Sequence, residues 1–149
     1  MLAFFRAIAD RHHLTFSFEA PPYAELAFKL PQQPHLAFDL SMVLQNRDEF
    51  CLQREGFSAH FFPFDDAAVR RDFVRTVDGL ISGEYRIVSM VHGASGTILE
   101  SRLQQFTGTA WSDQRICRLI RWRSVLWRMG LPIGEVQARE CRNLAAKAP

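Results

Sequence analysis

The sequence predicts an α+β fold in one domain, residues 1–149, with an antiparallel, meander-rich sheet of about six to eight strands and helices packed on one face. Three observations predict it. A length of 149 residues suits one domain. Apolar and polar residues alternate between turn signals over 35–63, as they do in consecutive antiparallel strands. Residues 66–81, in the middle of the chain, instead carry apolar side chains at helical spacing.

The N-terminal part predicts one helix and two strands. Apolar residues recur at helical spacing over 3–12, which predicts a short first helix. Residues 14–19 alternate apolar with polar side chains, as a strand with one buried face does. Residues 26–30 predict an edge strand, because Pro31 and Pro34 follow it closely.

The strongest strand pattern lies in residues 35–63. Alternation over 36–44, 50–53 and 57–62 predicts three strands. Polar turn residues at 46–48 and 54–56 separate them, so consecutive strands pair as hairpins. The chain holds 13 phenylalanines, many of them in these strands, and we expect a phenylalanine-rich core.

A central helix over 66–81 follows the meander. Its predicted N-cap is Asp65, and Gly83 is the expected left-handed residue after its end. Strands over 84–91 and 97–103 then form a further hairpin.

Residues 112–129 fit two structures. As a helix, the segment starts at Ser112 and ends before Gly130. As a strand, it is supported by isoleucine, cysteine and tryptophan, and we favour a strand at about 115–123. Residues 135–147 predict a modest C-terminal helix.

Basic residues concentrate at the C-terminal end. Residues 1–110 carry 10 Lys and Arg against 13 Asp and Glu, a net charge of −3, whereas 111–149 carry 8 against 3, a net charge of +5. Arginine and tryptophan are interspersed over 115–128, and this combination suits an acidic protein surface or nucleic acid. The candidate partner-binding residues are Arg118, Arg121, Trp122, Arg123 and Trp127.

These observations predict a non-enzymatic binding or adaptor protein whose partner is another protein or a second copy of the chain. The copy would bind through a sheet edge or through the basic aromatic segment. Nucleic acid is a weaker alternative, since a pI of about 8.6 is below that of typical nucleic-acid-binding domains.

No motif in the chain indicates catalysis, a metal or a cofactor. Three cysteines, Cys51, Cys117 and Cys141, are far apart and form no CxxC pair. The glycines within 93–96 end a strand without opening a helix, unlike a phosphate-binding loop. We therefore expect neither a cofactor nor a metal.

The alternative is a small-molecule-binding domain or small enzyme with a pocket between sheet and helix. His60, His92 and Tyr85 would supply its polar groups. Which small molecule it would take stays open.

The chain is expected to be cytoplasmic. Its unpaired cysteines suit a reducing compartment, and its first residues lack the basic and apolar regions of a secretion signal. No apolar run approaches the ~18 residues of a membrane span.

Overall fold

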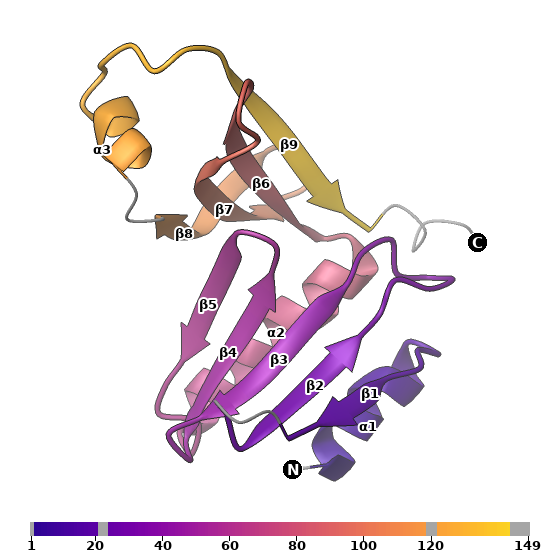
Figure 1. The fold of residues 1–149 in the computed structure, drawn as a ribbon. Coiled ribbons are helices and arrows are strands. Elements are labelled where there is room, and N and C mark those ends of the chain that lie inside the picture. The colour runs from indigo at the N-terminus through magenta and orange to yellow at the C-terminus, as the bar shows by residue number, and fades with distance from the viewer. Residues whose placement is uncertain (1, 21–23, 119–121, 144–149) are drawn as a thin grey trace.

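Two antiparallel sheets and three helices make up the part of the chain that the computed structural model describes, residues 2–20, 24–118 and 122–143 (Figure 1). The first sheet has the order β1-β2-β3-β4-β5, and the second has the order β8-β7-β6-β9. The strands are β1 (Ser17–Glu19), β2 (Leu26–Leu30), β3 (Leu40–Gln45), β4 (Glu49–Arg54), β5 (Phe57–Phe61), β6 (Tyr85–His92), β7 (Ile98–Phe106), β8 (Trp111–Arg118) and β9 (Val136–Arg142). The helices are α1 (Leu2–Arg11), α2 (Ala67–Ser82) and α3 (Trp122–Arg128). The predicted α+β class with a central helix is confirmed.

The first sheet is the predicted meander, in which each strand pairs antiparallel with the next. Asn46 and Arg47 join β3 to β4 with φ angles of 52° and 70°, the left-handed backbone that hairpin turns between twisted strands require. The resulting register sets Val43 opposite Cys51, and Cys51 opposite His60. Side chains alternate between faces along a strand, so these three share the face of the sheet away from the core.

Phenylalanine rings fill the space between the first sheet and helices α1 and α2, which lie on the same face of that sheet (Figure 1). Phe5 of α1 stacks on Phe28 of β2 with ring centroids 4.5 Å apart. Phe73 of α2 meets Phe61 of β5 edge-on at 5.2 Å. Phe5 and Phe73 are fully buried, so the expected phenylalanine-rich core is confirmed.

Helix α2 begins and ends at polar and glycine caps. The backbone N–H groups of Ala68 and Val69 donate to Oδ1 of Asp66, at 2.6 and 3.3 Å. The N-cap is therefore Asp66, and the prediction of Asp65 was one residue early. Gly83 ends the helix with φ 76°, as predicted, since the left-handed region is strained for residues with a Cβ.

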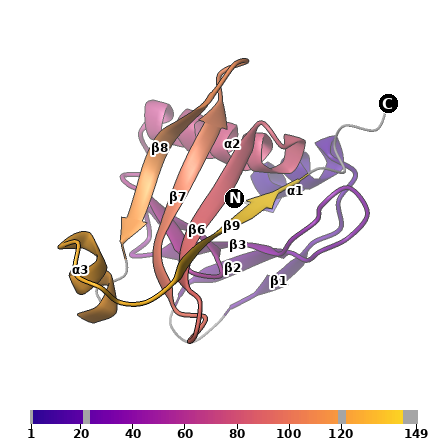
Figure 2. The same ribbon diagram turned by 90° about the horizontal axis from the view of Figure 1, so that it is seen from above.

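The second sheet packs against the same hydrophobic core as the first sheet and helix α2 (Figure 2). Tyr85 and Ile87 of β6 and Leu103 of β7 are buried in the same hydrophobic cluster as the phenylalanines. Asn143, directly after β9, donates hydrogen bonds to the carbonyl oxygens of His35 and Ile81. The end of β9 is thereby tied both to the loop between β2 and β3 and to helix α2.

The predicted C-terminal helix over 135–147 was wrong. Val136–Arg142 forms strand β9, which pairs antiparallel with β6 along its length. The residues favour a helix by propensity, but β6 is a buried strand whose free side needs a hydrogen-bonding partner, and this tertiary pairing decides the structure. Residues 144–147 of the predicted helix lie outside the described residues. The described chain therefore has nine strands in two sheets rather than six to eight in one.

Residues 112–129 contain one element of each predicted kind. Their first part is strand β8, Trp111–Arg118, and their last part is helix α3, Trp122–Arg128. The favoured strand at about 115–123 was thus right for its first residues, and the helix ending before Gly130 was right for the last. Residues 119–121, between the two elements, lie outside the described residues.

Candidate functional site

The predicted binding residues lie at the junction of β8 and α3. Arg118 is the last residue of β8, and Trp122 and Arg123 are the first two of α3; their side chains, and Arg121 as a whole, lie outside the described part of the chain. Trp127, in the last turn of α3, is half-buried. The end of β8 and helix α3 lie at an outer corner of the molecule (Figure 2).

The end of α3 has a fixed backbone. The N–H of Leu131 donates to the carbonyl oxygen of Leu126 at 3.0 Å, and the N–H of Gly130 donates to that of Trp127 at 3.0 Å. Gly130 has φ 72°. These are the two hydrogen bonds and the left-handed residue of a Schellman motif, which closes a helix and satisfies its last carbonyl groups.

Three apolar side chains project into solvent from this helix end. Val125, Met129 and Leu131 are 38%, 68% and 45% exposed. Val125 and Met129 are four residues apart and therefore neighbours on one face of the helix. We call these three residues, together with the exposed Arg128, the α3 surface.

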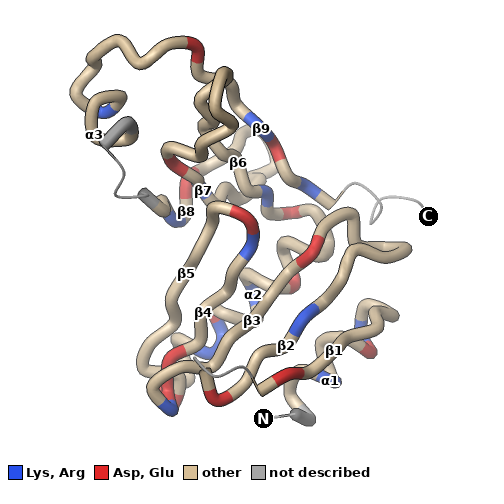
Figure 3. Tube along the Cα trace, in the orientation of Figure 1, with Lys and Arg blue, Asp and Glu red and all other residues tan. Residues whose placement is uncertain are grey.

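Arginines of β8 and its neighbours are engaged within the protein. Arg115 donates to Oδ2 of Asp72 at 2.6 Å and to the carbonyl oxygen of His60 at 3.0 Å, and it lies over the ring of Phe61. The guanidinium groups of Arg86 and Arg142 both lie over the ring of Trp111, at 4.1 and 4.8 Å from the ring centre. Charges of both signs are accordingly mixed over both sheets (Figure 3).

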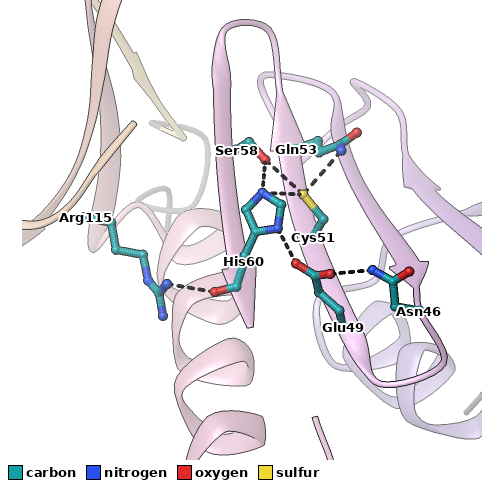
Figure 4. A network of polar contacts seen from close by, with 7 residues as sticks. All are labelled: Asn46, Glu49, Cys51, Gln53, Ser58, His60 and Arg115. Carbon is teal, nitrogen blue, oxygen red and sulfur yellow. Dashed lines mark hydrogen bonds and ion pairs between the residues drawn. The ribbon is translucent and has the colours of Figure 1, made fainter. Parts of the chain in front are cut away.

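A second group of polar side chains lies on the outer face of the first sheet, on the hairpin of β4 and β5 (Figure 4). The Cys51 Sγ atom is 3.7 Å from Nε2 of His60 and 2.9 Å from Oγ of Ser58. The Gln53 amide donates to Sγ at 3.3 Å. Nδ1 of His60 is 2.6 Å from a carboxylate oxygen of Glu49. We call these five residues the thiol cluster.

Glu49 is held in its charged form. Hydrogen bonds from His60 and then from Asn46 lower the pKa of the Glu49 carboxyl below its ordinary value, and they outweigh the opposing effect of burial. A carboxylate only accepts hydrogen bonds, so the nitrogen of His60 that faces it carries a proton. The other ring nitrogen faces the sulfur.

A groove of about 610 Å³ adjoins the thiol cluster. Its floor is a cross-strand row of Ser17, Lys29, Ser41 and Gln53, each opposite the next in the register of the sheet. Gln53 belongs both to this floor and to the shell around the sulfur. The side chain of Gln53 therefore connects the groove to the sulfur.

The structure does not bring His60, His92 and Tyr85 together. His60 lies on the outer face of the first sheet, half exposed, beside Glu49. His92, at the end of β6, contacts Oγ of Ser95 and the carbonyl oxygen of Ile133. Tyr85 is buried under α2, where desolvation raises the pKa of its hydroxyl. Because the three side chains lie in separate environments, they do not line one pocket as predicted.

The contact between Cys51 and His60 is not among the sequence-based predictions, which treat the two residues separately. The signal was available in the alternation of Glu49, Cys51 and Gln53 on one strand and of Ser58 and His60 on the next. A tight turn at 54–56 fixes the register that sets the two rows side by side.

The described residues hold no trio of histidine, cysteine, aspartate or glutamate side chains arranged as metal ligands. None of the described helices has both the length and the apolar character needed to cross a bilayer. No protein-family model, no curated protein and no solved structure matches the chain.

Proposed function

We propose that this protein is a binding or adaptor protein that docks a partner protein on the α3 surface. The observation that carries the proposal is the exposure of Val125, Met129 and Leu131 at one helix end. Single exposed apolar residues are ordinary on protein surfaces, but several gathered at one place are typical of interaction sites. Methionine is common at such sites because its side chain adapts to different partners.

The fixed backbone of the helix end supports the same proposal. Binding costs less free energy when the contact residues are already ordered before the partner arrives. The hydrogen bonds from Gly130 and Leu131 to the last turn of α3 hold the surface in one shape. The partner therefore meets apolar side chains at defined positions.

Arg128 favours an acidic partner, because it is exposed beside the apolar side chains of the α3 surface. The segment that contains this surface, residues 111–149, carries a net charge of +5, although Arg115 and Arg142 within it are engaged inside the protein. Interfaces commonly combine an apolar centre with a charged rim that steers the complementary partner. We expect the partner to present apolar residues flanked by aspartate or glutamate.

Nucleic acid remains the weaker candidate partner. Arg115 is paired with Asp72, and Arg86 with Glu140, so neither guanidinium is left to neutralise a phosphate. Phosphate binding depends on the number of free cations at the surface.

The test compares two variants of the full chain. Val125→Asp with Met129→Asp places charges in the centre of the α3 surface, and Phe62→Asp changes a matched side chain elsewhere, since Phe62 is 61% exposed. Affinity purification from the native host should recover at least one acidic protein with the wild type and with Phe62→Asp, and lose it with the double variant.

Light scattering on the same three purified proteins identifies the alternative partner, a second copy of the chain. A dimer that only the double variant dissociates would place self-association on the α3 surface. Identical partners and identical mass for all three proteins would contradict the proposal.

A further inference from the structure

The thiol cluster contains the parts of a nucleophilic site in contact order. Cys51 is followed by a nitrogen base, His60, at 3.7 Å, and His60 by a carboxylate, Glu49, at 2.6 Å. A nucleophile, a base within reach of it, and a third group that orients the base are the signature of covalent catalysis in unrelated folds. Figure 4 shows the three side chains in this order across β4 and β5.

We infer that Cys51 is a nucleophilic thiol that accepts an acyl group from an activated ester or thioester, with His60 as its base. This site is independent of the α3 surface. It lies on the first sheet, and none of its residues belongs to α3 or to the segment that follows it.

The hydrogen bonds decide the direction of proton transfer. Glu49 is ionised and accepts the proton on Nδ1 of His60, so in the neutral ring Nε2 carries a lone pair. That lone pair faces the thiol of Cys51 and the hydroxyl of Ser58, at 3.7 and 3.3 Å. His60 is thus the acceptor for the proton of Sγ, and Glu49 stabilises the imidazolium that results.

Two hydrogen-bond donors lie close to the sulfur, where negative charge develops when the thiol loses its proton. The Gln53 amide and the Ser58 hydroxyl lie 3.3 and 2.9 Å from Sγ, and both can donate a hydrogen bond to a thiolate. The Ser58 hydroxyl already lies beside the sulfur, so its hydrogen bond to the thiolate needs little reorganisation during the reaction.

The substrate reaches the sulfur from the groove. Cys51 is 1% exposed, so a substrate meets it only when the covering side chains move. Gln53 is half-buried, lines the groove of about 610 Å³ and covers the sulfur. Rotation of this one side chain opens Sγ to the groove, whose volume is that of a small-molecule site.

The reaction balances without a metal or a redox partner. The thiol proton of Cys51 moves to Nε2 of His60, and Sγ forms a bond to the acyl carbon. The bond between that carbon and the leaving alcohol or thiol breaks, and the leaving group takes the proton from His60. Water then attacks the thioester with His60 again as base, which releases the carboxylic acid and restores the Cys51 thiol.

The three cysteines allow an internal comparison with p-nitrophenyl acetate as the probe. Cys117 is more exposed than Cys51, so accessibility alone predicts that Cys117 is acetylated first. The proposal predicts the reverse order, with Cys51 faster by about tenfold or more, as expected when a general base assists. The measurement is peptide mass spectrometry of the full chain after timed reaction at neutral pH. Acetylation of Cys51 no faster than that of Cys117 would overturn the assignment.

Two variants test the partners of the thiol. His60→Gln should slow Cys51 acetylation about a hundredfold at neutral pH, because the amide cannot take the proton. It should leave Cys117 unaffected. His60 is 56% exposed at its side chain, so we expect this variant to fold, which circular dichroism checks. An unchanged Cys51 rate in folded His60→Gln would overturn the role of His60.

Glu49 is assigned as a positioning residue and needs a separate readout. Glu49→Gln should slow Cys51 acetylation at neutral pH and move the acid limb of its pH profile to lower pH, since the imidazolium loses its charged partner and gives up its proton more readily. The only charged side chain that contacts the His60 ring in the described structure is Glu49, because Arg115 bonds to the His60 carbonyl oxygen. An unchanged profile would overturn this assignment. Cys117→Ser serves as the control variant and should leave the Cys51 rate unchanged.

Discussion

Arg115 shows how a residue within the basic segment serves the fold. Its guanidinium bonds to Asp72 of α2 and to the carbonyl oxygen of His60 on β5, so one side chain joins the second sheet to both neighbours. Burial on its own would raise the pKa of the Asp72 carboxyl, but the hydrogen bonds that it accepts from Arg115 and Arg75, together with their charges, outweigh burial and lower that pKa below its ordinary value. The folded protein therefore favours ionised Asp72.

This pair predicts a pH dependence of stability. A carboxyl whose pKa is lower in the folded state stabilises the protein above its unfolded pKa, about 3.9 for aspartate, and this stability is lost as the pH falls through the folded pKa. Asp72→Asn should therefore destabilise the protein at neutral pH and by a smaller amount near pH 3. Urea denaturation at the two pH values measures the difference.

Asp65→Asn is the control for this experiment. The side chain of Asp65 is exposed and has no hydrogen bond within the described part of the chain. Its effect should be small at both pH values. An equal loss of stability at both pH values for Asp72→Asn would contradict the role of the Arg115 pair.

The junction between α2 and β9 depends on a glycine. Gly83 has φ 76°, and a Cβ placed on it would lie 2.2 Å from the carbonyl oxygen of Asn143. The backbone of Asn143 follows β9, the strand that replaced the predicted helix. Space at Gly83 thus lets Asn143, directly after β9, pack against the end of α2.

A pair of alanine variants tests this packing. Gly96 also has a positive φ, 63°, but no atom lies within 4 Å of a Cβ built there. Gly96→Ala should cost only the backbone strain, about 1–2 kcal/mol. Gly83→Ala should cost more than that in the free energy of unfolding, because Asn143 must also shift. Equal losses for the two variants in urea denaturation would show that the junction is not tightly packed.

Local pattern was sufficient for the elements whose partners are close in sequence. The bounds of β2 and the end of α2 at Gly83 followed from proline, glycine and apolar spacing, although β2 pairs on both sides and is not the predicted edge strand. The local sequence pattern did not predict β9, because pairing with the distant strand β6 is what makes an extended backbone favourable at these residues. The change from β8 to α3 likewise depends on contacts that single-residue propensities do not contain.

The sequence likewise predicted only part of the α3 surface and of the thiol cluster. Composition alone marks the basic aromatic segment that contains Trp127, and its role in binding stays a prediction. The exposure of Met129 and Leu131 depends on the fold, and sequence gives no measure of it. The contact between Cys51 and His60 depends on strand register, which the turn at 54–56 predicts only once both strands are accepted.

The molecule as a whole presents two sites on different parts of its surface. The α3 surface combines apolar side chains with the basic end of the chain, and the thiol cluster lies on the outer face of the first sheet. A partner bound to the α3 surface therefore does not cover the thiol cluster. The binding proposal is central to this account, because it alone uses the uneven distribution of charge.

Site-specific photo-crosslinking in living cells tests that proposal most directly. A photoreactive phenylalanine analogue replaces Met129, which is 68% exposed, and in a control replaces Phe62, which is 61% exposed. We predict an adduct with an acidic protein, or with a second copy of the 17.1 kDa chain, from position 129 and none from position 62. No adduct from position 129, or the same adducts from both positions, would contradict the account.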